Sequence, residues 1–214
     1  MNSITKKVSV QRGMFLIGIL LSCAVMVGWA DNWEAIQRES AKIKSVSASF
    51  SQEKRMQILK KPLISKGHFY YQSPDLVRWE YTSPVKSVLL MHTGDIKRYT
   101  SGSKGFVEDS GRSVESMYIV LQEISRWSRG QFTANEHFSA TLNKDTKGTK
   151  IILTPKEKGL AAMISRIVIT LSPHRPGVIK SVKISENAGN STLFEFSNVE
   201  INGKINEALF REAG

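Results

Sequence analysis

The sequence predicts a mainly β protein of the α+β class, in which antiparallel strands form a sheet that curls into a barrel or sandwich. Three observations lead to this prediction. Short segments with strand patterns recur along most of the chain, turn residues separate them, and only two segments have the spacing of an amphipathic helix. Many short strands joined by turns are typical of closed or strongly curved antiparallel sheets.

Two helices are predicted. The first spans residues 32–43, where Asp31 or Asn32 can cap the N-terminus and Trp33, Ile36 and Ile43 share a face. The second spans residues 113–128, with polar residues opposite an apolar stripe. That stripe consists of Val114, Met117, Tyr118, Leu121 and Ile124. Its apolar face must be covered, and the concave side of the sheet is the expected partner, either as core packing or as a lid over a cavity.

Eight segments are predicted as strands. Residues 77–81 alternate apolar and charged side chains, as a strand with one buried face does, whereas residues 88–91 are apolar on both faces. Arg78 and Glu80 then share the outer face, where a surface ion pair is expected. The full set of predicted strands is 46–50, 68–71, 77–81, 88–91, 150–154, 164–171, 178–185 and 192–199.

The N-terminus has the three parts of a secretory signal. Basic residues at 6, 7 and 12 precede an uncharged apolar run over residues 14–27, and Gly28 and Ala30 supply the small residues that a leader peptidase reads. We therefore expect a signal peptide over residues 1–30, cleavage after Ala30, and one domain over residues 31–214 in the periplasm. Cys23 falls inside the leader, so the mature chain has no cysteine unless Cys23 is itself acylated, as in a lipoprotein.

The mature chain is basic, with 27 lysines and arginines against 19 acidic residues. An exported protein rarely meets nucleic acid, so acidic lipid head groups or acidic proteins are the expected partners, and transient membrane contact fits this charge. A monomer is expected.

No catalytic, metal or cofactor site is predicted. The four histidines are scattered without the spacing of zinc ligands, and Ser110 lies in a turn-like Asp-Ser-Gly segment with no candidate base. The glycines near Ser103 lack the spacing of a phosphate-binding loop. A binding function is therefore expected in preference to an enzymatic one.

Apolar side chains instead supply a candidate binding surface. Aromatic residues and methionines suit a wall that repacks around varied acyl chains. The candidate lipid-binding residues are Phe50, Phe69, Tyr71, Val77, Trp79, Tyr81, Leu89, Met91, Met117, Val120, Leu121 and Ile124. The same pattern also fits a solid core.

Four segments of the chain contain motifs of a known protein family. Residues 46–52 read as an "ssFxQ" strand, and residues 67–81 form a glycine-led strand, a proline turn and a strand ending in Arg-Trp-Glu-Tyr. Together with residues 189–196 and 201–210, they resemble the opening strand, core motif and closing segments of the LolA family of periplasmic lipoprotein carriers. The resemblance implies an incomplete, strongly curved antiparallel β-barrel with a hydrophobic cavity under a helical lid.

The resemblance also implies a function and partners. Members bind the acyl chains of lipoproteins and carry them from an inner-membrane ABC transporter to an outer-membrane receptor. One departure stands out, because the family often places an arginine before the turn proline to tie the barrel to the lid, and this position is Ser73 here. A hydroxyl cannot supply the several charge-assisted hydrogen bonds of an arginine.

Three alternatives remain open at this point. A specialised paralogue could carry a glycolipid or another envelope lipid. A membrane-anchored acceptor of the related LolB type would require acylation of Cys23. An envelope hydrolase with an unusual site is the third.

Overall fold

The computed structural model describes residues 33–103, 105–109, 122–145 and 148–213. The chain divides into two compact units, one ending at Ile36 and one from Gln37 onward, and the sheet and cavities below belong to the second. The predicted signal peptide lies outside the described residues. So does most of the predicted 113–128 helix, including Met117, Val120 and Leu121.

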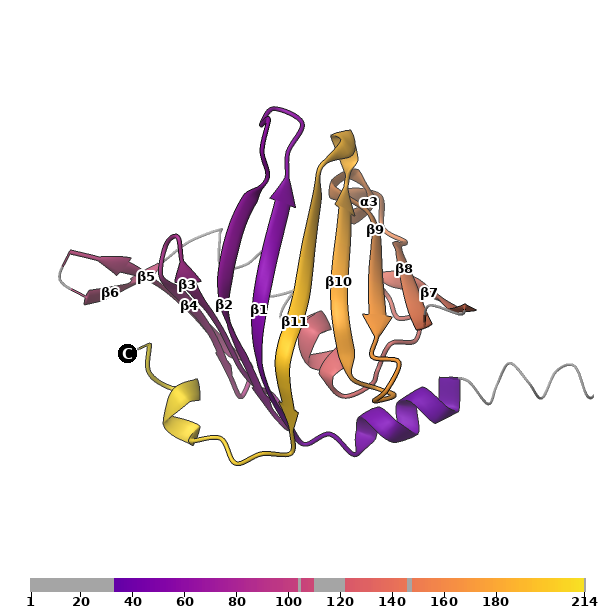
Figure 1. The fold of residues 1–214 in the computed structure, drawn as a ribbon, viewed down its shortest axis with the longest axis horizontal. Coiled ribbons are helices and arrows are strands. Elements are labelled where there is room, and N and C mark those ends of the chain that lie inside the picture. The colour runs from indigo at the N-terminus through magenta and orange to yellow at the C-terminus, as the bar shows by residue number, and fades with distance from the viewer. Residues whose placement is uncertain (1–32, 104, 110–121, 146–147, 214) are drawn as a thin grey trace, which may run out of the picture. The chain divides into compact units, whose positions relative to one another are not determined.

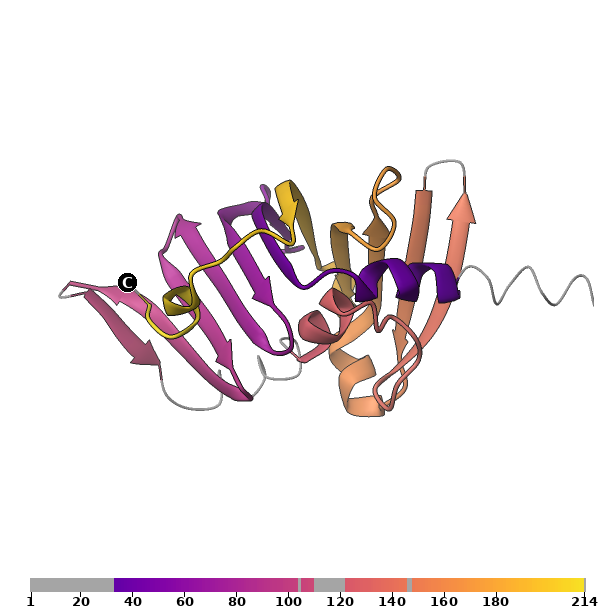
Figure 2. The same cartoon turned by 90° about the horizontal axis from the view of Figure 1, so that it is seen from below.

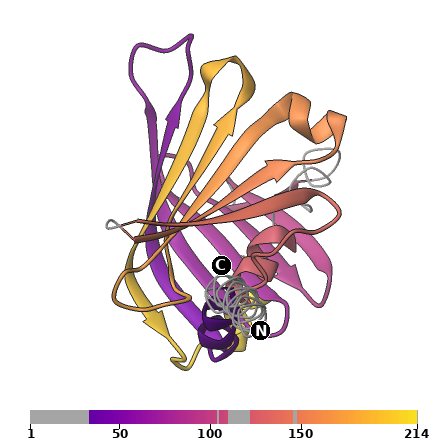
Figure 3. The ribbon, with the colours of Figure 1, turned by 90° about the vertical axis from the view of Figure 1, so that its right-hand side faces the viewer.

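The second unit is built on a single antiparallel sheet of eleven strands in the order β6-β5-β4-β3-β2-β1-β11-β10-β9-β8-β7, so that β6 and β7 form its two edges. The sheet is not closed, and it curls around one concave side (Figures 1 and 3). The predicted curved, incomplete antiparallel barrel is thus confirmed. The strands are β1 Ser45–Arg55, β2 Leu63–Gln72, β3 Leu76–Ser83, β4 Ser87–His92, β5 Asp95–Gly102, β6 Gly105–Asp109, β7 Phe138–Asp145, β8 Gly148–Pro155, β9 Ile164–Leu171, β10 Ile179–Glu186 and β11 Ser191–Ile201.

Short helices accompany the sheet. One occupies residues 33–41, close to the predicted range, and another occupies residues 122–128, the described end of the second predicted helix. The 122–128 helix lies inside the curve of the sheet (Figure 3). The others are α3 Lys158–Met163 and the 3-10 helices η1 Asn187–Gly189 and η2 Glu207–Phe210.

All eight predicted strands are present as β1–β4 and β8–β11. The sequence analysis missed β5, β6 and β7. No residue of β5 or β6 is fully buried, so these strands lack the apolar alternation that identifies a half-buried strand. The described side chains of β7 include one buried residue, Phe138.

The concave face carries an aromatic core. Strand register aligns Phe69 with Trp79 and Trp79 with Leu89, so alternate residues of β2, β3 and β4 point the same way. The ring centroids of Phe50 and Trp79 are 4.8 Å apart, and those of Trp79 and Phe194 are 5.2 Å apart with nearly perpendicular planes. Such pairs contribute about 0.5–1.5 kcal/mol each beyond their burial. They join the two halves of the sheet through β1 and β11.

The convex face of β3 is covered by the C-terminal segment, which corrects the expected surface ion pair. Arg78 is only 5% exposed. Its Nε donates to Glu80 Oε2 at 2.9 Å, and its Nη1 and Nη2 donate to carbonyls of the C-terminal segment at Leu209, Glu212 and Ala213. Figure 2 shows η2 beside β3 and β4, and Phe210 of η2 is fully buried. This cover explains why residues 88–91 are apolar on both faces.

Candidate functional site: an apolar cavity inside the curved sheet

A cavity of about 530 Å³ lies on the concave side of the sheet. Its walls come from both halves of the sheet and from the 122–128 helix, which contributes Ile124 and Trp127. Most of the lining side chains are aliphatic or aromatic, because they occupy the inward alternate positions of their strands. The cavity volume falls within the range of about 300–1,000 Å³ that ligand sites occupy. The geometry suits an elongated apolar ligand.

The candidate residues divide into three groups. The first group lines the cavity and consists of Phe69, Trp79, Tyr81, Leu89 and Ile124. A second group, formed by Phe50, Tyr71, Val77 and Met91, is buried in the core cluster that supports the same wall. The remaining three, Met117, Val120 and Leu121, lie outside the described residues.

The C-terminal half of the sheet supplies wall residues that the sequence analysis did not select. They are Ile167, Val182, Ile184, Phe194 and Phe196, on β9, β10 and β11. The sequence signal was present, because Phe194 and Phe196 alternate with the polar residues Glu195 and Ser197, as in a strand with one apolar face. What the sequence could not show was that this face meets that of β1–β4 across one cavity.

A few polar groups interrupt the apolar wall. The Tyr81 hydroxyl donates to Gln52 Oε1 at 2.6 Å, and burial raises the pKa of Tyr81 above its ordinary value. The indole of Trp79 lies close enough to the Tyr81 oxygen to oppose that rise in pKa, but its buried Nε1 makes no hydrogen bond of good geometry within the described residues. A buried donor without a partner is costly, so an acceptor atom on a ligand would be favoured beside it.

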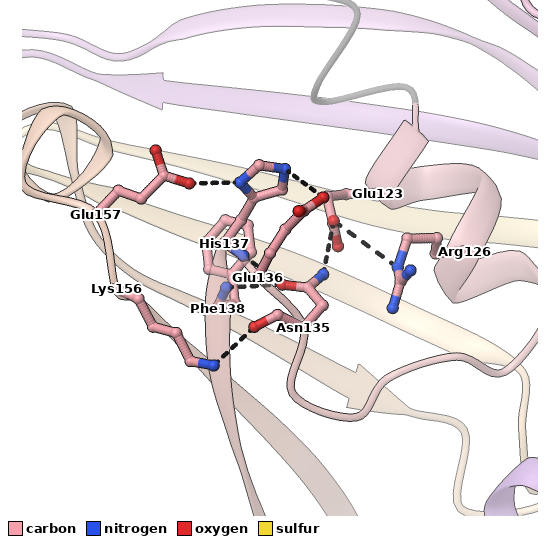
Figure 4. Close-up of polar contacts among 8 residues, drawn as sticks. All are labelled: Glu123, Arg126, Asn135, Glu136, His137, Phe138, Lys156 and Glu157. Carbon is pink, nitrogen blue, oxygen red and sulfur yellow. Dashed lines mark hydrogen bonds and ion pairs between the residues drawn. The ribbon is translucent and has the colours of Figure 1, made fainter.

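Polar contacts attach the 122–128 helix to the loop before β7 (Figure 4). Glu123 is only 5% exposed, and its Oε1 accepts from Asn135 Nδ2 at 2.8 Å and lies 3.8 Å from Arg126 Nε. Burial raises the pKa of the Glu123 carboxyl, while Arg126 and Asn135 act in the opposite direction. His137 Nδ1 lies 2.6 Å from Glu157 Oε1, which links the same loop to the start of α3.

A second contact joins this helix to the turn between β2 and β3. Asp75 Oδ1 accepts from Arg129 Nη1 at 3.1 Å and from Ser125 Oγ at 3.3 Å. These residues line a polar cavity of about 640 Å³ next to the apolar one, and Glu123 belongs to the walls of both. The helix therefore separates an apolar chamber from a polar one.

Neither a metal site nor a membrane-spanning helix is found in the described part of the chain. Its histidine, aspartate and glutamate side chains form no group of three that could hold a metal ion. Its helices are too short or too polar to cross a bilayer.

Comparisons with known proteins identify the family of the chain. The chain is 24% identical to an outer-membrane lipoprotein carrier protein of Pseudoalteromonas translucida (strain TAC 125), over 91% of this chain and 89% of that protein. It is 24% identical to a protein of the same description from Proteus mirabilis (strain HI4320), over 90% and 92% of the two chains. A solved LolA superfamily protein from Nitrosomonas europaea matches with a TM-score of 0.44 and 10% identity, over 84% of this chain and 97% of that one. The model of the family described as outer membrane lipoprotein carrier protein LolA matches residues 41–212, so the chain belongs to the LolA family.

Proposed function

We propose that the protein is a periplasmic carrier that holds the acyl chains of lipoproteins in the cavity and moves them from the inner to the outer membrane. The observation that carries this proposal is the apolar cavity, whose walls come mainly from β1–β4, β9–β11 and the 122–128 helix. Membership of the LolA family and the names of the related carriers support the choice of lipoproteins as cargo.

The free energy of transfer explains why a lipoprotein carrier needs such a cavity. Each methylene kept from water is worth about 0.8 kcal/mol, so three chains of about 15 carbons represent roughly 36 kcal/mol. A flat surface patch cannot shield chains of that length. The 122–128 helix, which covers the cavity with Ile124 and Trp127 and is tied to two loops by polar contacts, is the element best suited to move aside for loading and release.

The polar groups of the wall fit the polar end of an acyl chain. The Nε1 of Trp79, which makes no hydrogen bond of good geometry among the described residues, could donate to an ester or amide carbonyl. The transporter that would load the carrier and the receptor that would unload it are, in this proposal, an inner-membrane ABC transporter and an outer-membrane lipoprotein receptor.

A release assay tests the proposal. The purified mature protein is added to spheroplasts that contain newly acylated lipoprotein, and the soluble fraction is examined for a one-to-one complex. We expect release of lipoprotein bound to the protein. Absence of release, in a preparation where an established carrier works, would contradict lipoprotein cargo. Envelope lipid co-purifying with the protein would then identify a different amphiphile.

A further inference from the structure

Four of the connections between strands lie at the same end of the sheet, where β1 finishes and β2 begins. Strand register places the end of β1 opposite the starts of β2 and β11, because Lys54 pairs with Leu63 and Arg55 with Ser191. Glu186 at the end of β10 likewise pairs with Ile164 at the start of β9. The β1–β2 connection, the β10–β11 turn and α3 consequently lie at the same end of the sheet, at the top of Figure 1. The β3–β4 connection lies at this end too, because Ser83 at the end of β3 pairs with Lys66 near the start of β2. We call these four connections the rim.

The rim and its first flanking residues hold most of the exposed aliphatic side chains. Among the described residues seven large hydrophobic side chains are exposed, and six of them lie here. The six are Ile58, Leu59, Leu63, Ile64, Val85 and Met163. Ile58, near the tip of the β1–β2 connection, is 83% exposed. Clustered exposed apolar residues mark interaction surfaces, whereas isolated ones need no explanation.

Lysines accompany these apolar residues. Lys60 and Lys61 follow Leu59 in the β1–β2 connection, Lys86 follows Val85, and Lys158 begins α3, all of them exposed. Glu157 is the one carboxylate within the four connections, each of which lies in the described part of the chain. Aliphatic side chains beside lysines and few acids are the pattern of a surface that binds anionic lipid head groups.

The cavity extends to the end of the sheet that carries the rim. Lys54, Leu160 and Met163 belong to its lining, and each lies on or beside the rim. The 122–128 helix lies nearer the other end of the sheet, away from the rim (Figures 1 and 3). An acyl chain that left a bilayer beneath the rim would therefore meet apolar wall directly.

We propose that the rim docks reversibly on a bilayer that contains anionic lipid, with Ile58 and Leu59 inserted among the head groups and the lysines on the phosphates. This inference rests on the proposed function, because it names the surface at which the carrier exchanges acyl chains. A lipid surface fits better than a protein because the aliphatic side chains protrude from turns between lysines, which suits insertion among phosphate groups.

Vesicle sedimentation tests the rim. The mature protein is mixed with phosphatidylethanolamine vesicles that contain phosphatidylglycerol, or with phosphatidylcholine vesicles alone. We expect partition onto the anionic vesicles that weakens as salt is raised. Lys60→Glu with Lys61→Glu, and separately Ile58→Ser with Leu59→Ser, should each lower the partition coefficient by about tenfold or more. Matched controls are Lys97→Glu on β5 and Val107→Ser on β6, both exposed and outside the rim, which should partition like the wild type.

Binding of a fluorescent fatty acid, measured on the same proteins without vesicles, separates this inference from the proposed function. The rim variants should keep that binding. The rim proposal would be overturned if the wild-type protein did not partition onto anionic vesicles. It would also be overturned if the rim variants partitioned as strongly as the wild type. Vesicle binding that requires an integral membrane protein in the bilayer would also overturn it and assign the rim to a protein partner. If the wild type binds vesicles but does not bind the fatty acid, the result would contradict the carrier function and leave the rim proposal standing.

Discussion

Asp75 and Arg129 form an ion pair, with Asp75 Oδ1 3.1 Å from Arg129 Nη1, that joins the β2–β3 turn to the end of the 122–128 helix. The family resemblance implies an arginine before the turn proline, where this chain has Ser73. Here the cation comes from the helix side and the anion from the turn, and Ser125 adds a hydroxyl donor to the same carboxylate. The turn and the helix are thus linked by an ion pair in which the turn supplies the carboxylate, whereas Ser73 itself carries no charge.

Asp75→Ala should loosen the helix more than it destabilises the fold. Both partners are partly exposed, so the pair is worth about 0.2–1 kcal/mol, and the free energy of unfolding should fall by no more than that. Hydrogen exchange of the amides at 122–128 should become faster, because local opening needs less free energy. Asp95→Ala, at the exposed start of β5, is the control. Unchanged exchange at 122–128 would show that the pair does not hold the helix.

Arg78→Met should be strongly destabilising. The guanidinium is buried and bonds to Glu80 and to three carbonyls of the C-terminal segment, all of which would lose their donor. Removing one partner of such a buried pair costs about 3–5 kcal/mol, and the partial exposure of Glu80 places the expectation near about 3 kcal/mol. Urea denaturation measures the loss, and proteolysis should cleave first near the C-terminus.

Arg175→Met provides the matched control for Arg78. Arg175 is exposed and donates to one backbone carbonyl, that of Val199, at 2.9 Å. Its loss should cost about 1 kcal/mol or less. Equal destabilisation by the two variants would argue against the C-terminal segment as a structural cover of β3 and β4.

The sequence was informative where one face of a strand is buried. The alternation in residues 77–81 identified β3 and the inward direction of Trp79, and the glycine-led residues 67–72 lie within β2. It was uninformative where burial is weak, as in β5 and β6. Arg78 shows a third case, because local spacing placed it on the outer face, and only tertiary packing against residues 209–213 buries it.

Gly67→Ala tests the packing behind the cavity wall. A Cβ at Gly67 would collide with the Glu80 carbonyl group and the Phe50 ring. Relief would require the backbone of β2 or β3 to shift, so we expect a loss of about 1–3 kcal/mol in thermal or urea unfolding, typical of overpacking. Gly159→Ala is the matched control, because its Cβ would enter open space within α3 and alanine favours helix there. A similar effect of both substitutions would contradict this reading.

Ala48→Phe should block the cavity. Ala48 is buried on β1 and lines the wall, so an added ring would occupy space that the cavity offers and would lower the free energy of unfolding by about 1–3 kcal/mol. Binding of a fluorescent fatty acid should weaken at least about tenfold, equal to the loss of about 1.4 kcal/mol of binding free energy. Ala208→Phe, at an exposed position of η2, should bind normally. Normal binding by Ala48→Phe would place the ligand elsewhere.

Glu123→Gln should change how stability depends on pH. Burial raises the pKa of Glu123, and Arg126 opposes that shift, so the folded protein holds this proton more tightly than the unfolded chain does. The free energy of unfolding therefore falls as the pH rises from the ordinary glutamate pKa through the folded-state value. Glutamine is neutral at every pH, and its amide oxygen can still accept from Asn135.

We therefore expect Glu123→Gln to melt at a higher temperature than the wild type at neutral pH, and the two melting temperatures to converge in acid. Thermal unfolding across this pH range measures the difference, with Glu195→Gln on the exposed side of β11 as the control. A difference that stays constant with pH would mean that the Arg126 contact offsets burial of the charge. Convergence in acid would instead mean that protonation of Glu123 strengthens the hold of the helix between the two chambers.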